Sequence, residues 1–466
     1  MSPIAAFRRL SRVLRVLLTH GPGLVWHALW RTGRAPDRLR RLVQAFGGTY
    51  VKFGQVLALQ PDLLPRAYCD ALLELLDRIE PFPFAEAARV LEAELGKPVD
   101  ALFDAIDRTP LATASIGQIH VAQLDGQKLA VKVRRPAVEG DFEFDIRVMT
   151  TFVWLVERLR WRRLAWLVEP TREFVQWTRE ELDFRHEARY AAALGRQARD
   201  VPAQVVAEVV EGFTSRRTLV TRFLEGIPLL AYLRARNEND EVTLERVRQL
   251  GFDEATFAAN LIDNFLSDVF RHGVYHADLH PANLFILPDN RVGYVDFGII
   301  GVMSPHSRRH LVSMTLAVAL GDIGAMAREY LEVTEHGPGS DYPGLRHGLE
   351  TLARGWYEDG PQGRRLTENF TIVMLEMLQL SRRTRIMPER DIVKYIRSAI
   401  AIDGLIHRFS ADFDLGEHLA SSCAQLILGQ VVATRLTGHR LLDWINAVQR
   451  LTDGGSDRLV EALGRI

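Results

Sequence analysis

The chain has 466 residues, of which 47% are hydrophobic and 25% charged, and both shares are those of a globular protein. Its formal net charge of -1 gives no support for nucleic-acid binding by the molecule as a whole. The chain has only two cysteines, Cys69 and Cys423, far apart in sequence. A disulfide framework or a cysteine-based metal site is therefore not expected, and we expect a cytoplasmic, reducing environment.

Residues 1–41 are basic, because this segment contains many arginines and a single acid, Asp37. Apolar residues recur here at helical spacing, at Ile4, Phe7, Leu10, Leu14, Leu17 and Leu18. The pattern predicts a basic amphipathic helix. Two interpretations stay open: the helix lies on an anionic membrane, on its inner face, or its apolar stripe packs on the protein.

A second helix is expected after residue 46. Lys52 and Gln55 lie three positions apart, so they share one face of this helix, among apolar neighbours. A buried lysine and glutamine need polar partners. The face is therefore either an exposed polar edge or a surface that meets acids elsewhere in the chain.

Two strands are predicted at residues 118–124 and 128–133, since Asp125-Gly126 between them is a strong hairpin signal. In a kinase, the residues before the first strand form the glycine-rich loop over ATP. Here that position holds mainly alanine, so the loop should be stiffer than one made of glycine. The small residues expected to border the nucleotide are Ala112, Ala114 and Ser115.

Lys132, in Ala-Val-Lys on the second strand, matches the kinase lysine that pairs the α- and β-phosphates. The alternative is an edge-strand lysine that faces water. Residues 137–197 are helical by pattern and carry a group of acids. Glu187 is the predicted helix partner of Lys132, while Glu181 and Asp183 remain without an assigned basic partner.

Further strands are expected at residues 204–210 and 218–223. The stretch Leu224-Glu225-Gly226 follows them and resembles a hinge to a second lobe, where Glu225 would border the nucleotide. Beyond residue 244 the pattern is almost wholly helical, apart from one stretch that carries most of the chemistry. The apolar run at 419–436 is broken by polar residues, so it predicts a buried helix and not a membrane span.

That chemical stretch is residues 274–298, in which Asp278 precedes Asn283 by five positions and Asn283 precedes Asp296 by thirteen. Two short strands, 284–287 and 292–295, should bring its ends together. Asn283 and Asp296 would then offer oxygen ligands to Mg²⁺, and Asp278 could orient or deprotonate a nucleophile. This is the layout of a protein-kinase catalytic loop followed by Asp-Phe-Gly.

The catalytic loop departs from that of protein kinases in one place. It has His276-Ala277-Asp278 instead of His-Arg-Asp, and His280 follows. Small-molecule phosphotransferases of the aminoglycoside-kinase type have a similar His-x-Asp-x-His. A polar hairpin with Asp and Asn as turn formers is the alternative without chemistry.

Taken together, these motifs resemble the UbiB, or aarF-domain, family of atypical kinases over roughly residues 46–330. Its Lys-x-Gly-Gln motif is similar to residues 52–55, its alanine-rich loop to 111–120, and its strand-lysine segment to 130–136. Glu181-x-Asp183 resembles its Glu-x-Asp motif. Asp-Phe-Gly is followed by no activation segment, as that resemblance leads one to expect.

The resemblance implies an α+β, protein-kinase-like fold of two lobes with an added helical N-terminal extension, which would lie over the active site. Lys52 would then pair with Glu181 or Asp183, and Lys52 and Gln55 would close the acceptor side of the pocket. It also implies ATP or ADP and Mg²⁺ as cofactors, and an isoprenoid-lipid or quinone intermediate, a peripheral membrane and a biosynthetic enzyme complex as partners.

The expected segments are residues 1–45, a basic amphipathic helix; 46–105, a helical extension; 106–226, the kinase-like N-lobe with inserted helices; and 227–466, the helical C-lobe. The first hypothesis is an ATP- and Mg²⁺-dependent atypical kinase or ATPase that supports ubiquinone or other isoprenoid-lipid biosynthesis. The alternatives are a small-molecule phosphotransferase and a nucleotide-regulated lipid-binding protein without turnover.

Overall fold

The chain folds into two compact units. A computed structural model describes residues 33–422, apart from 47, 59–64, 74, 76–80, 115, 137, 162–163, 320–321, 338, 358–369, 416–417 and 420, together with residues 11, 15–16, 18–23, 26 and 425. The first unit consists of Met1–Ala192, Ala207–Leu224 and Asp296–Ile299, and the second of Ala193–Val206, Glu225–Val295 and Ile300–Ile466. The division between Leu224 and Glu225 coincides with the predicted hinge.

The first unit contains an antiparallel sheet in the order β1-β3-β4-β6, with β2 paired to β3. Its strands are β1 (Ala105–Ile106), β2 (Ala112–Thr113), β3 (Gly117–Leu124), β4 (Gln127–Arg134) and β6 (Thr218–Arg222). The predicted hairpin is confirmed: Asp125 and Gly126 both have positive φ, 50° and 73°, which the tight turn between twisted strands requires.

The alternation of β4 decides what lies on each face of this sheet. Leu129, Val131 and Val133 are buried in a core shared with α5 (Phe84–Leu95) and α6 (Val99–Leu102). Lys132 has the opposite parity, so its side chain leaves the sheet on the other face. There it meets α9 (Phe184–Gln197), the last of the helices that follow β4.

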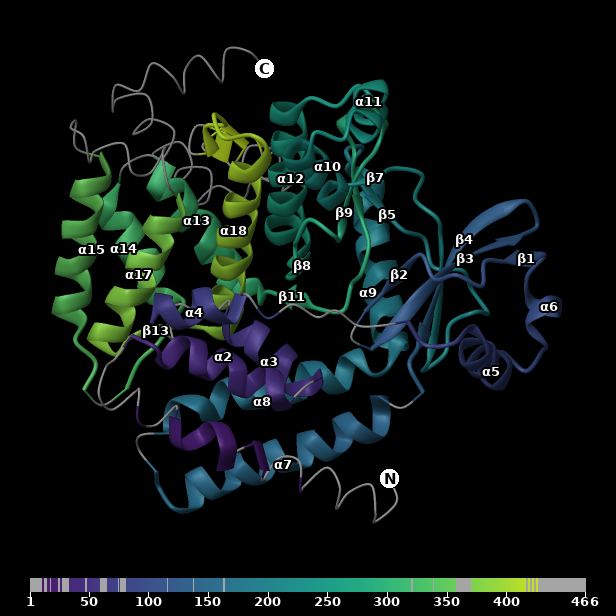
Figure 1. Cartoon of the computed structure of the whole chain (residues 1–466). Coiled ribbons are helices and arrows are strands. Elements are labelled where there is room, and N and C mark those ends of the chain that lie inside the picture. The colour runs from purple at the N-terminus through teal and green to yellow at the C-terminus, as the bar shows by residue number, and fades with distance from the viewer. Residues whose placement is uncertain are drawn as a thin grey trace. The chain divides into compact units, whose positions relative to one another are not determined.

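The remaining helices of the first unit pack as two groups. α2 (Ala35–Phe46), α3 (Gly48–Ala58) and α4 (Arg66–Leu73) share one apolar cluster. α7 (Val138–Arg158), the short η1 (Ala165–Leu167) and α8 (Val168–Glu181) form a helical hairpin, seen below the N-terminal helices in Figure 1. Tyr50 and Phe53 of α3 pack against this hairpin, with the rings of Phe53 and Phe174 5.0 Å apart.

The second unit contains a small sheet in the order β5-β10-β9-β7 and a separate pair, β8 with β11. The strands are β5 (Gln204–Val206), β7 (Ile227–Pro228), β8 (Val274–His276), β9 (Leu284–Ile286), β10 (Val292–Tyr294) and β11 (Ile300–Val302). The predicted strand at 204–210 is too long: β5 ends at Val206, and Val209 instead bridges Thr221 of β6. The predicted strands around 284–295 are confirmed.

Helices make up most of the rest of the second unit, as the pattern beyond residue 244 predicts (Figure 1). Aspartates cap three of them: Asp240, Asp253 and Asp322 each accept backbone N–H groups of the first turn. The helical elements are η2 (Ala198–Asp200), α10 (Leu229–Glu238), α11 (Glu241–Gln249), α12 (Glu254–Ser267), η3 (Asp268–His272), η4 (Pro288–Asn290), α13 (Pro305–Ala319), α14 (Ile323–Glu332), α15 (Tyr342–Tyr357), α17 (Phe370–Thr384) and α18 (Arg390–Phe409), and the short strands are β12 (Thr334–Glu335) and β13 (Met387–Pro388).

Two expectations concern segments that are mostly outside the described residues. The basic amphipathic helix at the N-terminus is one, and the buried helix at 419–436 is the other. Among the helices that are described, none has both the length and the apolar character that a membrane crossing requires. The boundaries of the four expected segments stay a prediction.

Candidate active site

Lys132 lies at the centre of the first unit's polar cluster. Its β4 backbone pairs with Ile119 of β3 and Leu219 of β6, so the residue sits on a central strand. Its Nζ donates to both carboxylate oxygens of Glu187, each at 2.8 Å, and both residues are buried. The predicted ion pair between Lys132 and Glu187 is therefore confirmed, and the edge-strand alternative is wrong.

Asp296 approaches the same ammonium group, with its Oδ2 3.6 Å from Lys132 Nζ. Its backbone is left-handed, at φ 60°, a conformation that costs energy outside glycine and often marks a functional site. The backbone N–H of Gly298 donates to Asp296 Oδ1 at 3.2 Å. Nearly half of the Asp296 side chain is exposed, so this carboxylate can still accept a ligand.

The charge of Lys132 is secured by these two carboxylates. Burial disfavours the charged form, but Asp296 and Glu187 outweigh burial and raise the pKa of Lys132 above its ordinary value. The ammonium group is thus cationic at any physiological pH. A fixed cation beside an exposed carboxylate suits the binding of phosphates together with a divalent metal.

The second pair of the first unit joins two segments distant in sequence. Lys52 Nζ on α3 donates to Glu181 Oε2 at the end of α8, and each side chain is about one-fifth exposed. Glu181 is also close enough to Lys132 to contribute to its raised pKa. The prediction that Lys52 meets the Glu-x-Asp acids is confirmed for Glu181. Gln55 belongs to α3, but its side chain lies outside the described residues.

Asp183 departs from the expectation that it has no basic partner of its own. Arg185, two positions later, binds both of its oxygens, with Nε at 2.9 Å from Oδ1 and Nη2 at 2.6 Å from Oδ2. The hydrogen bonds from Arg185 lower the pKa of Asp183. The cause is local: a turn between α8 and α9 folds Arg185 back onto the preceding acid.

A buried arginine that sequence reasoning missed fixes this turn. Arg134, the last residue of β4, is almost completely buried, and its Nη1 donates to the backbone carbonyl of Leu182. Leu182 stands between Glu181 and Asp183, so Arg134 ties the acidic turn to the strand that carries Lys132. The signal was present in the sequence, in the run Lys132-Val133-Arg134, but its chemistry was assigned only to the lysine.

The alanine-rich segment forms a tight structure before β3. Ala112 pairs with Ile119, and the N–H of Ala114 donates to the carbonyl of Gly117 at 2.8 Å. A glycine is required at position 117 because the backbone of β4 lies very close: a Cβ there would be 2.5 Å from the carbonyl oxygen of Val133. Ser115 lies outside the described residues. The nucleotide-binding roles of Ala112, Ala114 and Ser115 stay predictions.

The second unit holds the catalytic loop, between β8 and β9. Asn283 is buried, and its Nδ2 donates to the carbonyl of Asp278 at 3.2 Å. The N–H of Asn283 donates to the backbone carbonyl of His280, and the carbonyl of Asn283 accepts from the N–H of Val295, the residue before Asp296. Asp278 is half-buried, and its N–H donates to His276 Nδ1 at 3.2 Å. Glu225, where the chain re-enters this unit after Leu224, is exposed.

The ligand atoms predicted for Mg²⁺ are distributed over the two units: Asn283 belongs to the second and Asp296 to the first. Their meeting at one metal ion stays a prediction. Within the described parts of the chain, no group of three or more His, Cys, Asp or Glu side chains could hold a metal. The oxygen donors of Asn283 and Asp296 suit Mg²⁺, which is usually held by one or two protein groups and by substrate phosphates.

Comparisons with known proteins agree with these motifs. Residues 74–330, more than half of the chain, match the ABC1 atypical kinase-like domain. The chain belongs to the ABC1 atypical kinase-like family. A probable protein kinase UbiB of Marinobacter nauticus is 30% identical over 387 residues, which cover 81% of this chain and 68% of that protein. One from Aeromonas salmonicida is 30% identical over 439 residues, 88% of this chain and 77% of that protein.

A solved structure supports the fold of this ABC1 family member. The structure of Rv3197 from Mycobacterium tuberculosis, in complex with erythromycin, has a TM-score of 0.53 and covers 82% of this chain and 94% of its own. It is 22% identical, so the likeness concerns the fold alone. Together with the family match, it confirms the predicted α+β, protein-kinase-like fold of two lobes with a helical N-terminal extension.

Proposed function

We propose that this protein is an ATP- and Mg²⁺-dependent atypical kinase or ATPase of the UbiB type. The observation that carries the proposal is the arrangement at Lys132, whose Nζ is held by Glu187 at 2.8 Å and lies 3.6 Å from Asp296 of Asp-Phe-Gly. A structural ion pair would need only one of these carboxylates. The second carboxylate, that of Asp296, is exposed, and the backbone of this residue is left-handed. Both features are expected of a group that binds a ligand.

Each group has a proposed role in holding the nucleotide. Lys132 binds the α- and β-phosphates of ATP, and Glu187 keeps its ammonium group in place. Asp296 and the amide oxygen of Asn283 hold Mg²⁺, which when bound neutralises charge on the phosphates. Ala112, Ala114, Ser115 and Glu225 border the nucleotide.

Asp278 acts on the nucleophile in this proposal. Its carboxylate accepts the proton of the attacking hydroxyl group or water. The oxygen of that group bonds to the γ-phosphorus, the bond between the γ-phosphorus and the bridging oxygen breaks, and ADP leaves with the electron pair. The backbone carbonyl of Asp278, which accepts from Asn283, keeps the loop in shape.

The acceptor is proposed from the relatives and from the N-terminal extension. Both UbiB proteins are named as probable protein kinases, and the UbiB resemblance connects the chain with ubiquinone or other isoprenoid-lipid biosynthesis. The pair of Lys52 and Glu181, near Lys132, would limit access for a protein substrate. An isoprenoid phenol or quinone precursor at a peripheral anionic membrane, within a biosynthetic enzyme complex, is the proposed setting.

The direct test is to measure ADP and phosphate formation from Mg²⁺-ATP, with and without anionic vesicles and a quinone-like phenol. We expect turnover that needs Mg²⁺ and rises with the lipid or the phenol. Absence of any ADP formation under all of these conditions would contradict the proposal and favour a nucleotide-regulated binding protein.

A small-molecule phosphotransferase is the second candidate. His280 favours it, since its ring accepts from the N–H of Ala282 and thereby shapes the loop of a His-x-Asp-x-His sequence. The pair of Lys52 and Glu181 argues against it, because an open acceptor site needs no such closure. Transfer of ³²P to a soluble hydroxylated metabolite, at the same rate without lipid, would select this candidate.

A further inference from the structure

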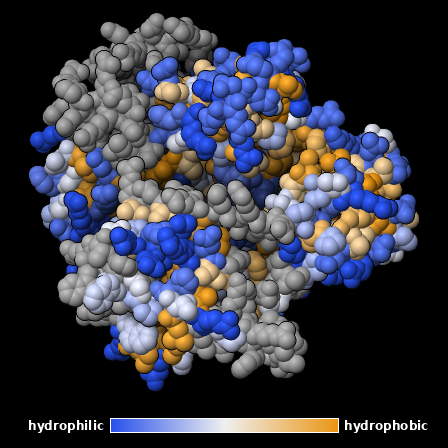
Figure 2. All heavy atoms as spheres, viewed as in Figure 1, coloured by the Kyte–Doolittle hydropathy of each residue, from blue (hydrophilic) through white to orange (hydrophobic). Residues whose placement is uncertain are grey.

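The end of the α7–α8 hairpin exposes large apolar side chains. Trp154 is 59% exposed, Leu159 52% and Trp161 48%, and Leu155 beside them is also exposed. In Figure 2, hydrophobic and hydrophilic residues adjoin at the lower left of the molecule, the region where this hairpin ends in Figure 1. Exposed tryptophans close together indicate an interaction surface, and indole rings favour the boundary between membrane and water.

The same hairpin end is positively charged. Arg158 and Arg160 are exposed, and the sequence continues with two more arginines, at 162 and 163. The acid within this run, Glu157, is neutralised by Arg172 of α8, which binds its two oxygens at 2.8 and 2.9 Å. An excess of positive charge beside exposed indoles complements an anionic surface.

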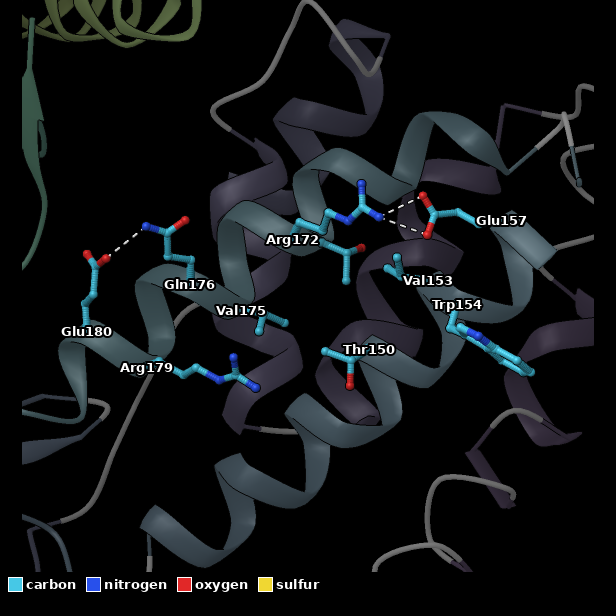
Figure 3. A pocket seen from close by; sticks show the side chains of 10 residues that line it. Thr150, Val153, Trp154, Glu157, Arg172, Val175, Gln176, Arg179 and Glu180 are labelled. Carbon is cyan, nitrogen blue, oxygen red and sulfur yellow. Dashed lines mark hydrogen bonds and ion pairs between the residues drawn. The ribbon is translucent and has the colours of Figure 1, made fainter.

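A cleft of about 610 Å³ opens beside Trp154, between α7 and α8. Figure 3 shows Arg179 extending from α8 in the direction of Thr150 on α7. Within the described residues, Arg179 has no hydrogen bond or ion pair. The lining is mostly polar and includes two carboxylates, Glu157, which Arg172 binds, and Glu180, which accepts from Gln176. The guanidinium group of Arg179 is the cation of this cleft that remains to bind the acidic headgroup of an anionic lipid.

Part of the α7–α8 hairpin is covered by another described helix of the first unit. α3 covers the pair of helices through Tyr50 and Phe53, and in Figure 3 the N-terminal helices lie behind the lining side chains. No described residue other than those of α7 and α8 lines the cleft. The exposed indoles, the arginines and the cleft are therefore available together to one partner.

We propose that the end of the α7–α8 hairpin is a docking surface for an anionic phospholipid bilayer. Trp154, Leu159 and Trp161 enter the interfacial layer of the bilayer, Arg158 and Arg160 bind lipid phosphates, and Arg179 binds one headgroup in the cleft. An acidic protein surface is the main alternative, and failure to bind anionic vesicles would favour it. The proposal does not depend on phosphoryl transfer.

The test is co-sedimentation of the full chain with vesicles of phosphatidylcholine, with and without phosphatidylglycerol. We expect binding that requires phosphatidylglycerol and weakens with salt. Arg158→Gln with Arg160→Gln should weaken it roughly 30-fold, since each basic residue near the surface contributes about a factor of five. Arg179→Gln should weaken it less, roughly five-fold.

A second measurement reports on insertion and is not moved by charge alone. Brominated phosphatidylcholine in the anionic vesicles should quench part of the tryptophan fluorescence, and Trp154→Ser with Trp161→Ser should remove that quenching. A matched control changes an exposed valine and an exposed arginine on another helix, Val242→Ser with Arg246→Gln on α11, and should bind as the unaltered protein does. Unchanged thermal unfolding of all variants verifies that their folds are intact.

Three results would overturn the proposal. The first is failure of the unaltered chain to bind anionic vesicles, and the second is equal binding by the arginine, tryptophan and control variants. The third is loss of binding on deletion of residues 1–30 while the hairpin variants bind normally, which would assign the membrane contact to the N-terminal segment instead.

Discussion

Two carboxylates of unequal burial share the ammonium group of Lys132. Glu187 is only 8% exposed and contacts Nζ through both oxygens, whereas the side chain of Asp296 is 46% exposed and lies farther away. Removing a buried partner from a buried charge is costly, so Glu187 is a fixed part of the fold. Asp296 has room to bind a ligand, and the two acids are not interchangeable.

Asp296→Asn should therefore remove most Mg²⁺-dependent nucleotide binding and leave the fold intact. The change keeps the size of the side chain but removes the charge that attracts the metal. Thermal unfolding with and without Mg²⁺-ATP measures the effect: the unaltered protein should be stabilised and the variant should not. If both are stabilised equally, the metal role of Asp296 is wrong.

Sequence reasoning predicted the partners of Lys132 and Lys52 because each lysine had to meet an acid, and motif spacing left few choices. It failed at Asp183, whose partner Arg185 is a near neighbour that no long-range motif would indicate. It also missed Arg134, because burial of an arginine at a strand end depends on the turn that receives it. Local turns are fixed by packing, and packing is not visible in spacing.

At the scale of elements, Gly54 shows how the Lys-x-Gly-Gln helix packs. A Cβ at this position would lie 2.6 Å from Leu75 Cδ1 and 2.8 Å from Val43 Cγ1. The glycine thus lets α3 approach its neighbours closely, as the packing of this helical cluster requires. The motif contains a packing residue next to its polar ones.

Gly54→Ala should lower the free energy of unfolding of the first unit by about 1–3 kcal/mol, because the added methyl group overfills the cluster. Gly140→Ala is the matched control, since Gly140 lies in α7 of the same unit with nothing near its missing Cβ. It should be neutral or slightly stabilising. Chemical denaturation of both variants decides the matter, and equal effects would contradict the close packing at Gly54.

Asp268, the first residue of η3, is a buried acid in the second unit. Burial raises its pKa to about 7, while Gln204 Nε2 donates to its Oδ2 at 2.9 Å and lowers the pKa in part. Gln197 Nε2 can also reach its Oδ1 at 3.1 Å. The carboxyl group is therefore protonated in the folded state at pH values where it is ionised in the unfolded chain.

This difference has a definite sign. Between about pH 4 and pH 7 the folded state binds the proton and the unfolded state does not, so stability falls as the pH rises, by at most about 1.4 kcal/mol per pH unit. Asp268→Asn should remove that slope and raise stability near pH 7 relative to the unaltered protein. Unfolding curves across this range test the prediction, with the exposed Asp412→Asn as control. An unchanged slope in Asp268→Asn would contradict it.

Some elements were predictable because their local sequence signals are strong, and others lack such signals. The hairpin at Asp125-Gly126 and the strands beside the catalytic loop follow from turn residues and alternation. The strand expected at 204–210 was overestimated because β5 pairs in parallel with β10 for only three residues, after which the chain crosses into the first unit. Such a change of partner leaves no trace in hydrophobic periodicity.

At the scale of the whole molecule, the candidate site residues are divided between the two units. The order of these residues in the sequence does not predict which unit each belongs to. Asp296–Ile299 belongs to the first unit, while the sequence on both sides of it belongs to the second. Sequence motifs identified the kinase-like fold because their residue types and spacing resemble those of the family that the chain matches. They did not assign the segments to units, since that depends on contacts between distant parts of the chain.

The central claim, that this chain transfers the γ-phosphoryl group of ATP through Asp278, is tested most directly by the turnover of Asp278→Asn. The loss of a general base or of the group that positions the nucleophile should lower phosphate release from Mg²⁺-ATP by roughly 10² to 10⁴, while stabilisation by Mg²⁺-ATP in thermal unfolding is retained. Equal rates of phosphate release in the variant and the unaltered protein would contradict the account.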